Sequence, residues 1–83
     1  MENSAEKIIV ATFYNHYGAM MLKKALGKNA VLRPVPRALS SSCGTCVFIT
    51  DADENAVRDA SDENIEAIYR KNGDSYTEIW KAL

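Results

Sequence analysis

Two short segments that are apolar on both of their faces place the strongest constraint on the fold of this chain. The first runs from Lys7 to Phe13 and the second from Cys46 to Thr50. Both are rich in β-branched and aromatic residues, and neither alternates apolar with polar side chains. Strands that are covered on both sides show this pattern. We therefore expect both segments to be central strands of a sheet.

Two prolines identify a third strand as an edge strand. Residues 30–37 alternate in the manner of an extended segment, but Pro34 and Pro36 lie within it. Because proline cannot donate a hydrogen bond to a neighbouring strand, such a segment is tolerated at the margin of a sheet.

Helices are predicted on either side of these strands. Asn15 is a favourable N-cap, apolar residues recur at helical spacing after it, and Gly27 favours a C-terminal end. These signals predict a helix over residues 16–27.

A second, weaker helix is expected after Asp51 and a last strand over residues 65–70. The tail over residues 73–80 either extends that strand or forms a short docking helix.

The resulting order, βαββαβ, predicts an α+β fold. It is typical of the ferredoxin-like two-layer sandwich, whose antiparallel sheet has the strand order 4-1-3-2. A chain of 83 residues has room for one core. We expect a single domain over residues 1–83, with its core over about residues 7–70. Both helices would cover one face of the sheet, so the apolar residues on the other face predict a homodimer or contact with another domain.

Composition and charge argue against several classes of partner. The formal net charge is −1, and ten basic residues are set against eleven acidic ones, so no basic excess indicates nucleic acid. The polar, acidic start does not resemble a secretory signal, and no apolar run is long enough to span a bilayer. We expect a cytoplasmic protein that binds neither nucleic acid nor membrane.

The only two cysteines, Cys43 and Cys46, form a C-x-x-C motif in a serine-rich loop. Two thiols at this spacing can close a disulfide, carry sulfur or selenium, or provide half of a metal site. A purely structural disulfide is the weakest interpretation, because bridging residues so close in sequence constrains little chain entropy. The predicted topology places this loop at the sheet end where the first helix begins, and a helix N-terminus favours a nearby anion such as a thiolate.

Further residues could complete an anion site around Cys43. Each of them offers a hydrogen-bond donor, a positive charge or a flexible backbone. They are Asn15, His16, Arg37, Ser41, Ser42 and Gly44. Cys46 either resolves a persulfide on Cys43 or is a small buried strand residue.

The segments Pro34-Val35-Pro36-Arg37 and Ser41-Ser42-Cys43-Gly44-Thr45-Cys46 resemble those of the small bacterial selenium/sulfur carrier-like domains. The resemblance covers about residues 7–70. It implies a compact α/β unit that passes selenium or sulfur between proteins, with Cys43 at the Cys-Gly position of the family and Pro34, Pro36 and Arg37 at its Pro-x-Pro-Arg positions. Where that family tends to have a small hydroxyl residue before a histidine, this chain has Asn15 before His16.

The leading hypothesis is a non-enzymatic carrier that holds sulfur or selenium on Cys43 and interacts with donor and acceptor proteins. One chain offers too few ligands for a closed zinc site, so we expect no metal and no cofactor in a monomer. A zinc site of four thiolates shared by two chains remains an alternative. A thiol-disulfide redox module is another, although its C-x-x-C would precede a strand rather than a helix.

Overall fold

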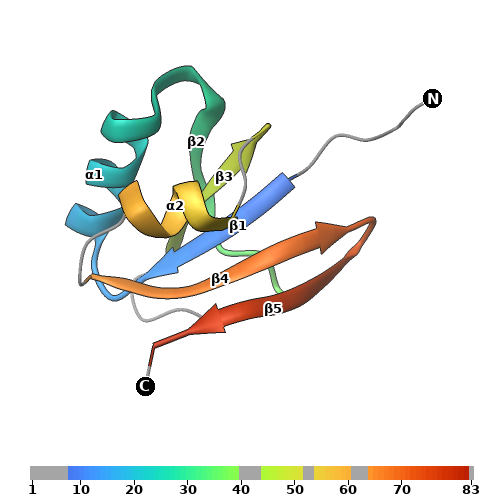
Figure 1. Cartoon of the computed structure of the whole chain (residues 1–83). Helices are drawn as coiled ribbons and strands as arrows, with labels where there is room; N and C mark the ends of the chain where they lie inside the picture. The colour runs from blue at the N-terminus through green and yellow to red at the C-terminus, as the bar shows by residue number, and fades with distance from the viewer. Residues whose placement is uncertain (1–7, 40–43, 52–53, 61–63, 83) are drawn as a thin grey trace.

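One layer of two helices packs on a five-stranded antiparallel sheet (Figure 1). The computed structural model describes residues 8–39, 44–51, 54–60 and 64–82. Along the chain the elements are β1 (Ile8–Phe13), α1 (His16–Leu26), the short 3-10 helix η1 (Gly27–Asn29), β2 (Ala30–Pro34), β3 (Thr45–Thr50), α2 (Glu54–Ala60), β4 (Ile65–Asn72) and β5 (Ser75–Lys81).

The strand order is β2-β3-β1-β4-β5. As expected, β1 and β3 are interior strands, and β2, which carries Pro34, lies at an edge. The predicted four-stranded ferredoxin-like sheet of order 4-1-3-2 is wrong, because β5 pairs with β4 and takes its place at the other edge. The element order is therefore βαββαββ.

The additional strand arises from a hairpin whose loop is Gly73-Asp74. Asn72 and Ser75 are cross-strand partners on either side of this loop. Gly73 has φ +62°, and a two-residue hairpin loop of the favoured, mirror-image type needs a positive φ at its first position. The tail is thus a strand of its own, neither an extension of β4 nor a docking helix.

Helix α1 has the ends that its sequence predicts. The side chain of Asn15 accepts a hydrogen bond from the backbone N–H of Gly18 at 2.9 Å, which satisfies a donor that the helix leaves free. Gly27 has φ +68°, and its N–H donates to the carbonyl oxygen of Lys23. A residue with a side chain would be strained in this conformation, so glycine ends the helix here.

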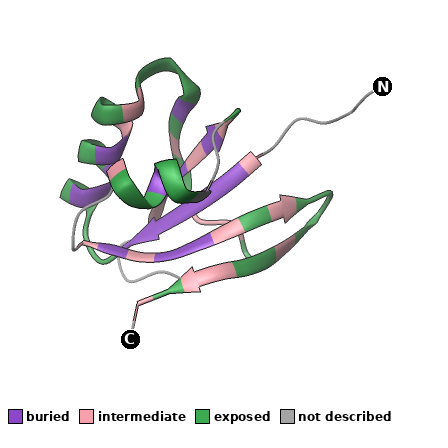
Figure 2. Cartoon of the chain, in the orientation of Figure 1, coloured by how far each residue is buried: buried purple, intermediate pink, exposed green. Residues whose placement is uncertain are grey.

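The main core lies between the helices and the sheet (Figure 2). Residues of alternate parity on β1 and β3 face the helices and pack against α1 and α2: Ile9, Ala11, Phe13, Val47, Ile49, Ala19, Leu22 and Val57. The only tryptophan, Trp80 of β5, packs at the margin of this core, and the guanidinium of Arg58 in α2 lies 5.3 Å from the centre of its ring.

The centre of the opposite sheet face is also buried. Val10, Thr12, Cys46 and Ala67 point away from the helices, and none is more than 1% exposed. In Figure 1 the segment after β2 passes behind β1 and β4, on the side away from both helices. The expectation of an open apolar face is therefore wrong for the centre of the sheet, where these four residues are buried. At the β2 edge Val31 remains 48% exposed.

Candidate functional site

The start of β3 and the start of α1 lie at the same end of the sheet. Thr12, near the end of β1, pairs with Cys46, near the beginning of β3. Helix α1 begins at His16, only three residues after β1 ends at Phe13. The predicted convergence of the cysteine loop and the helix N-terminus is thus supported by the register for the described end of that loop, Gly44 to Cys46.

The two segments on which the family resemblance depends meet at this end. The backbone N–H of Val35 donates to the carbonyl oxygen of Gly44 at 3.1 Å, one step beyond the pair Pro34–Thr45. Pro36 has no N–H to continue this ladder. The Pro-x-Pro-Arg segment therefore lies directly beside the residue that follows Cys43 in the sequence. We call this meeting point of residues 34–37 with residues 44–46 the motif junction.

Beyond the motif junction the chain turns sharply. The N–H of Leu39 donates to the carbonyl oxygen of Pro36 at 3.0 Å, the bond that closes a β-turn. Arg37 occupies the second position of this turn and is exposed. Its backbone is thus held near the junction by backbone hydrogen bonds on both sides, and its side chain is exposed.

Gly44 adopts a backbone conformation that supports its predicted role. Its φ is +75°, within the left-handed region that residues with a β-carbon rarely adopt, and the residue is exposed. A β-carbon at this position would meet open space, so the requirement for glycine is one of backbone conformation and not of packing.

Cys46 is buried and faces the sheet side away from the helices. It is 0% exposed, its thiol lies 3.7 Å from the carbonyl oxygen of Pro34, and its cross-strand neighbours are Thr12 and Arg33. This environment matches the interpretation of a small buried strand residue. The role of a resolving thiol stays a prediction, and it would require the beginning of β3 to open.

Asn15 and His16 occupy different environments at the helix start. In addition to its cap, Asn15 donates from its amide nitrogen to the side-chain oxygen of Asn64 at 3.0 Å, so the amide is engaged on both sides. His16 is exposed on the first turn, where no acidic residue is present. The absence of a carboxylate from the first turn of α1 favours an anion at this helix start.

Cys43, Ser41 and Ser42 lie outside the described residues, so their predicted roles stay predictions. Arg33 of β2 has its charge away from this site: its guanidinium lies 5.5 Å from the centre of the Phe48 ring, farther along β3.

Sequence reasoning missed the contribution of Asn64. Its carbonyl oxygen accepts a hydrogen bond from the N–H of Tyr14 at 2.8 Å, and its side chain contacts Asn15. Two bonds thus hold the β1–α1 connection against the segment before β4. The one local signal was Gly18, a glycine in the first turn of a helix, which indicates a close neighbour.

Among residues 8–39, 44–51, 54–60 and 64–82, no three histidine, cysteine or acidic side chains gather into a metal site. The same part of the chain contains no helix that is both long and apolar enough to cross a membrane.

The fold and the motif junction define a small α+β protein with a cysteine loop at one end of an antiparallel sheet. The chain belongs to the family described as "Putative Se/S carrier protein-like", whose model matches residues 8–81. This match extends the resemblance through β5. No curated protein and no solved structure matches the chain.

Proposed function

We propose that this protein carries sulfur or selenium as a persulfide or selenosulfide on Cys43. Membership of the Se/S carrier-like family supports the carrier class. The observation that carries the assignment to this residue is the bond from Val35 to Gly44, which brings the Pro-x-Pro-Arg segment beside the Cys-Gly position. Arg37 and the N-terminus of α1 then supply positive potential at the end of the sheet to which Cys43 is attached.

Loading requires no external oxidant. The thiolate of Cys43 attacks the terminal sulfur of a persulfide on the donor enzyme, and the donor's cysteine leaves as a thiolate. One S–S bond breaks and another forms, so no net oxidation occurs. Unloading repeats the step, with an acceptor thiolate attacking the terminal atom on Cys43. A selenium atom follows the same course as a selenosulfide.

Release through an acceptor thiol fits the structure better than release through Cys46. A disulfide between the two cysteines would require the buried Cys46 to leave its position between Thr12 and Arg33. Direct attack by the acceptor leaves β3 undisturbed, and the carrier returns to its thiol form without a separate reductant.

The test is the intact mass of the protein after incubation with a cysteine desulfurase and cysteine, or with a selenocysteine lyase and selenocysteine, under non-reducing conditions. We expect a gain of one sulfur or one selenium atom that reducing agent removes. Cys43→Ser should abolish the adduct, whereas the matched variant Cys46→Ser should retain it. Absence of any adduct, or an adduct that persists in Cys43→Ser, would refute the proposal.

A further inference from the structure

We propose that Asn72 is a self-modification site, at which the backbone nitrogen of Gly73 displaces the side-chain amide as ammonia and leaves aspartate or isoaspartate in the β4–β5 hairpin. This inference concerns the chemistry of the chain itself and does not depend on the proposed carrier function. Of the six asparagines in the sequence, Asn72 alone is followed by glycine. The other five precede residues whose side chains crowd the attacking nitrogen.

The reaction needs no cofactor and no oxidant. The nitrogen of Gly73 loses its proton to a base in solution and attacks Cγ of Asn72, and Nδ2 takes up a proton and leaves as ammonia. The product is a five-membered imide. Water then adds to one of its two carbonyl carbons and breaks the bond from that carbon to nitrogen. Opening at Cγ gives aspartate, and opening at the backbone carbon gives isoaspartate.

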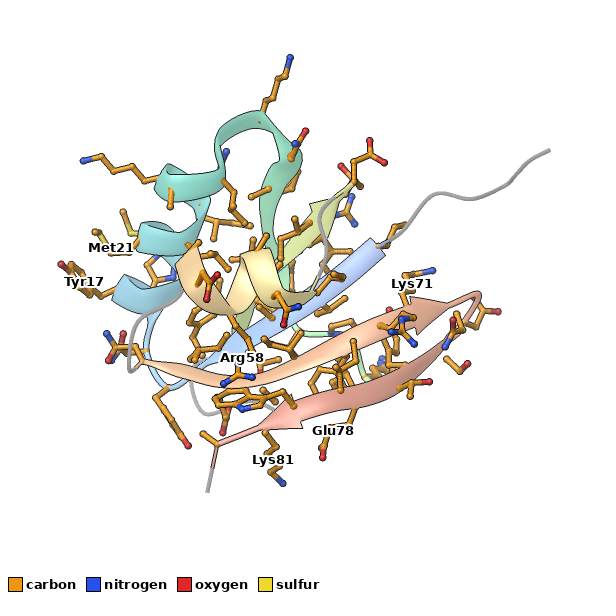
Figure 3. All side chains as sticks on the ribbon, in the orientation of Figure 1. Tyr17, Met21, Arg58, Lys71, Glu78 and Lys81 are labelled. Carbon is orange, nitrogen blue, oxygen red and sulfur yellow. The ribbon has the colours of Figure 1, made fainter. Side chains whose placement is uncertain are left out.

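The hairpin loop gives water and base access to this peptide bond. Residues 72–75 are all exposed, and a β-carbon at position 73 would meet no other part of the chain within 4 Å. Figure 3 shows the turn between β4 and β5 projecting at one end of the sheet, beyond Lys71 and clear of both helices. Gly73 lies past the last cross-strand pair, Asn72–Ser75, at a strand end, where local opening costs least.

A hydrogen bond from Ser75 makes the attacking nitrogen easier to deprotonate. Its Oγ donates to the carbonyl oxygen of Asn72 at 2.9 Å. That carbonyl belongs to the same peptide unit as the N–H of Gly73. The bond therefore draws electron density away from the nitrogen and stabilises its anion.

A second hydrogen bond holds the side chain of Asn72 away from the loop. Its Nδ2 donates to Oγ1 of Thr77 at 2.9 Å, and Thr77 pairs with Arg70, two residues before Asn72 on β4. The amide is thus directed back along the hairpin, whereas attack requires Cγ to lie against the nitrogen of Gly73. The bond to Thr77 must open first, so it slows the reaction in the folded protein.

Isoaspartate would loosen the hairpin end of β5. It adds the β-carbon of residue 72 to the main chain, and the extra atom prevents a two-residue loop from keeping residue 72 opposite Ser75. The other end of β5 stays anchored, because Trp80 packs at the main core and against Arg58. The change is therefore local, and it places an isoaspartyl carboxylate on a projecting turn that a modifying enzyme can reach.

The site is tested by incubating the wild-type protein in mildly alkaline buffer. Peptide mapping locates the product, and methylation by an isoaspartyl methyltransferase is the probe for isoaspartate. We expect Asn72 to convert at least about tenfold faster than Asn29 and Asn55, two exposed asparagines that precede alanine. Asn72→Gln should nearly abolish the product, because the longer side chain closes its ring far more slowly. Equal rates at the three asparagines would overturn the site.

The role of Thr77 is tested by removing the acceptor. Thr77→Val keeps the shape and the strand preference of the side chain and should speed conversion about threefold or more. Thr77→Ser is the matched control, since it keeps a hydroxyl, and it should convert at nearly the wild-type rate. A Thr77→Val protein that converts no faster would overturn the restraint by Thr77.

The variant Asn72→Asp separates the charge of the product from its altered backbone. In the isoaspartate form, isolated by chromatography, the amide hydrogens of residues 75–78 should exchange about tenfold faster than in wild type, and in Asn72→Asp they should not. An isoaspartate form that exchanges like Asn72→Asp would overturn the loosening of β5. Retention of Asn72 as asparagine in the folded protein would overturn the inference as a whole.

Discussion

Gly18 of α1 packs so closely against Asn64 that a β-carbon at position 18 would lie 2.7 Å from the β-carbon of Asn64. The same β-carbon would lie 2.9 Å from the ring of Phe13. The helix and the segment before β4 are therefore in contact at a point where only hydrogen fits. This contact fixes the position of the helix start relative to the sheet.

Gly18→Ala should lower the free energy of unfolding by about 1–2 kcal/mol, because crowding outweighs the helix preference of alanine. Urea denaturation measures this change. The reverse exchange at the exposed position 25, Ala25→Gly, is the matched control and should cost about 1 kcal/mol through helix propensity alone. A stabilised Gly18→Ala protein would show that Asn64 and Phe13 move aside freely.

Asn15→Ala should destabilise the protein by about 1–2 kcal/mol, since it removes both the cap of α1 and the bond to Asn64. Asn15→Asp keeps an oxygen that can accept from Gly18 and places a negative charge at the helix start, so it should cost less. Equal losses for the two variants, measured by urea denaturation, would contradict a capping role.

Cys46 should be protected from alkylation in the native protein. In the variant Cys43→Ser, where it is the single thiol, iodoacetate should modify it at least about a hundredfold more slowly than in urea, because a buried strand residue reacts only after opening. The reaction is followed by mass spectrometry. Rapid modification without denaturant would show that β3 opens easily at Cys46, and it would restore the resolving role.

Tyr69 should make the protein less stable in alkali. Burial raises the pKa of its hydroxyl above the ordinary value of 10.0, and the carboxylates of Glu78 and Glu66 raise it further. The unfolded chain therefore loses this proton at lower pH than the folded chain. The stabilising contribution is complete below about pH 10 and is lost as pH rises toward the folded pKa.

Urea denaturation between pH 8 and pH 11 measures this effect. The decline in stability above about pH 10 should be smaller in Tyr69→Phe, which has no proton to lose. Glu78→Gln should also reduce it, since a neighbouring negative charge is removed. An unchanged decline in Tyr69→Phe would assign it to other groups.

Most of the framework could be predicted from the sequence because its signals are local. The cap at Asn15, the stop at Gly27 and the proline in β2 each act on neighbouring backbone, and each has its predicted effect. The two-sided apolar pattern likewise identified β1 and β3 as interior strands.

Strand β5 was missed because its pattern is broken. Ile68 pairs with Trp80 and Tyr69 with Glu78, so the register shifts and Ile79 has no direct partner in β4. Ile79 and Trp80 are consecutive, yet both pack at the main core. A bulge of this kind disrupts the period of two by which strands are identified. The available hairpin signal was the loop dipeptide Gly73-Asp74.

The contacts that assemble the candidate site depend on distant parts of the chain. The bond between Asn15 and Asn64 spans 49 positions, and no local pattern predicts it. The bond between Val35 and Gly44 likewise joins residues nine positions apart. Family resemblance identified residues 34–37 and 43–44 as motif positions, and the bond from Val35 to Gly44 joins the described parts of these two segments.

The bond between Val35 and Gly44 has a consequence for how cargo can travel. Eight residues separate these two anchor points, and Cys43 immediately precedes the second of them. Its α-carbon can be no farther than about 3.8 Å from that of Gly44. Such a short tether cannot serve as a swinging arm that visits remote catalytic centres. In the proposed carrier function, each enzyme would therefore bring its own reactive group to Cys43, and the shape of the protein, not the reach of a linker, would govern which enzymes it serves.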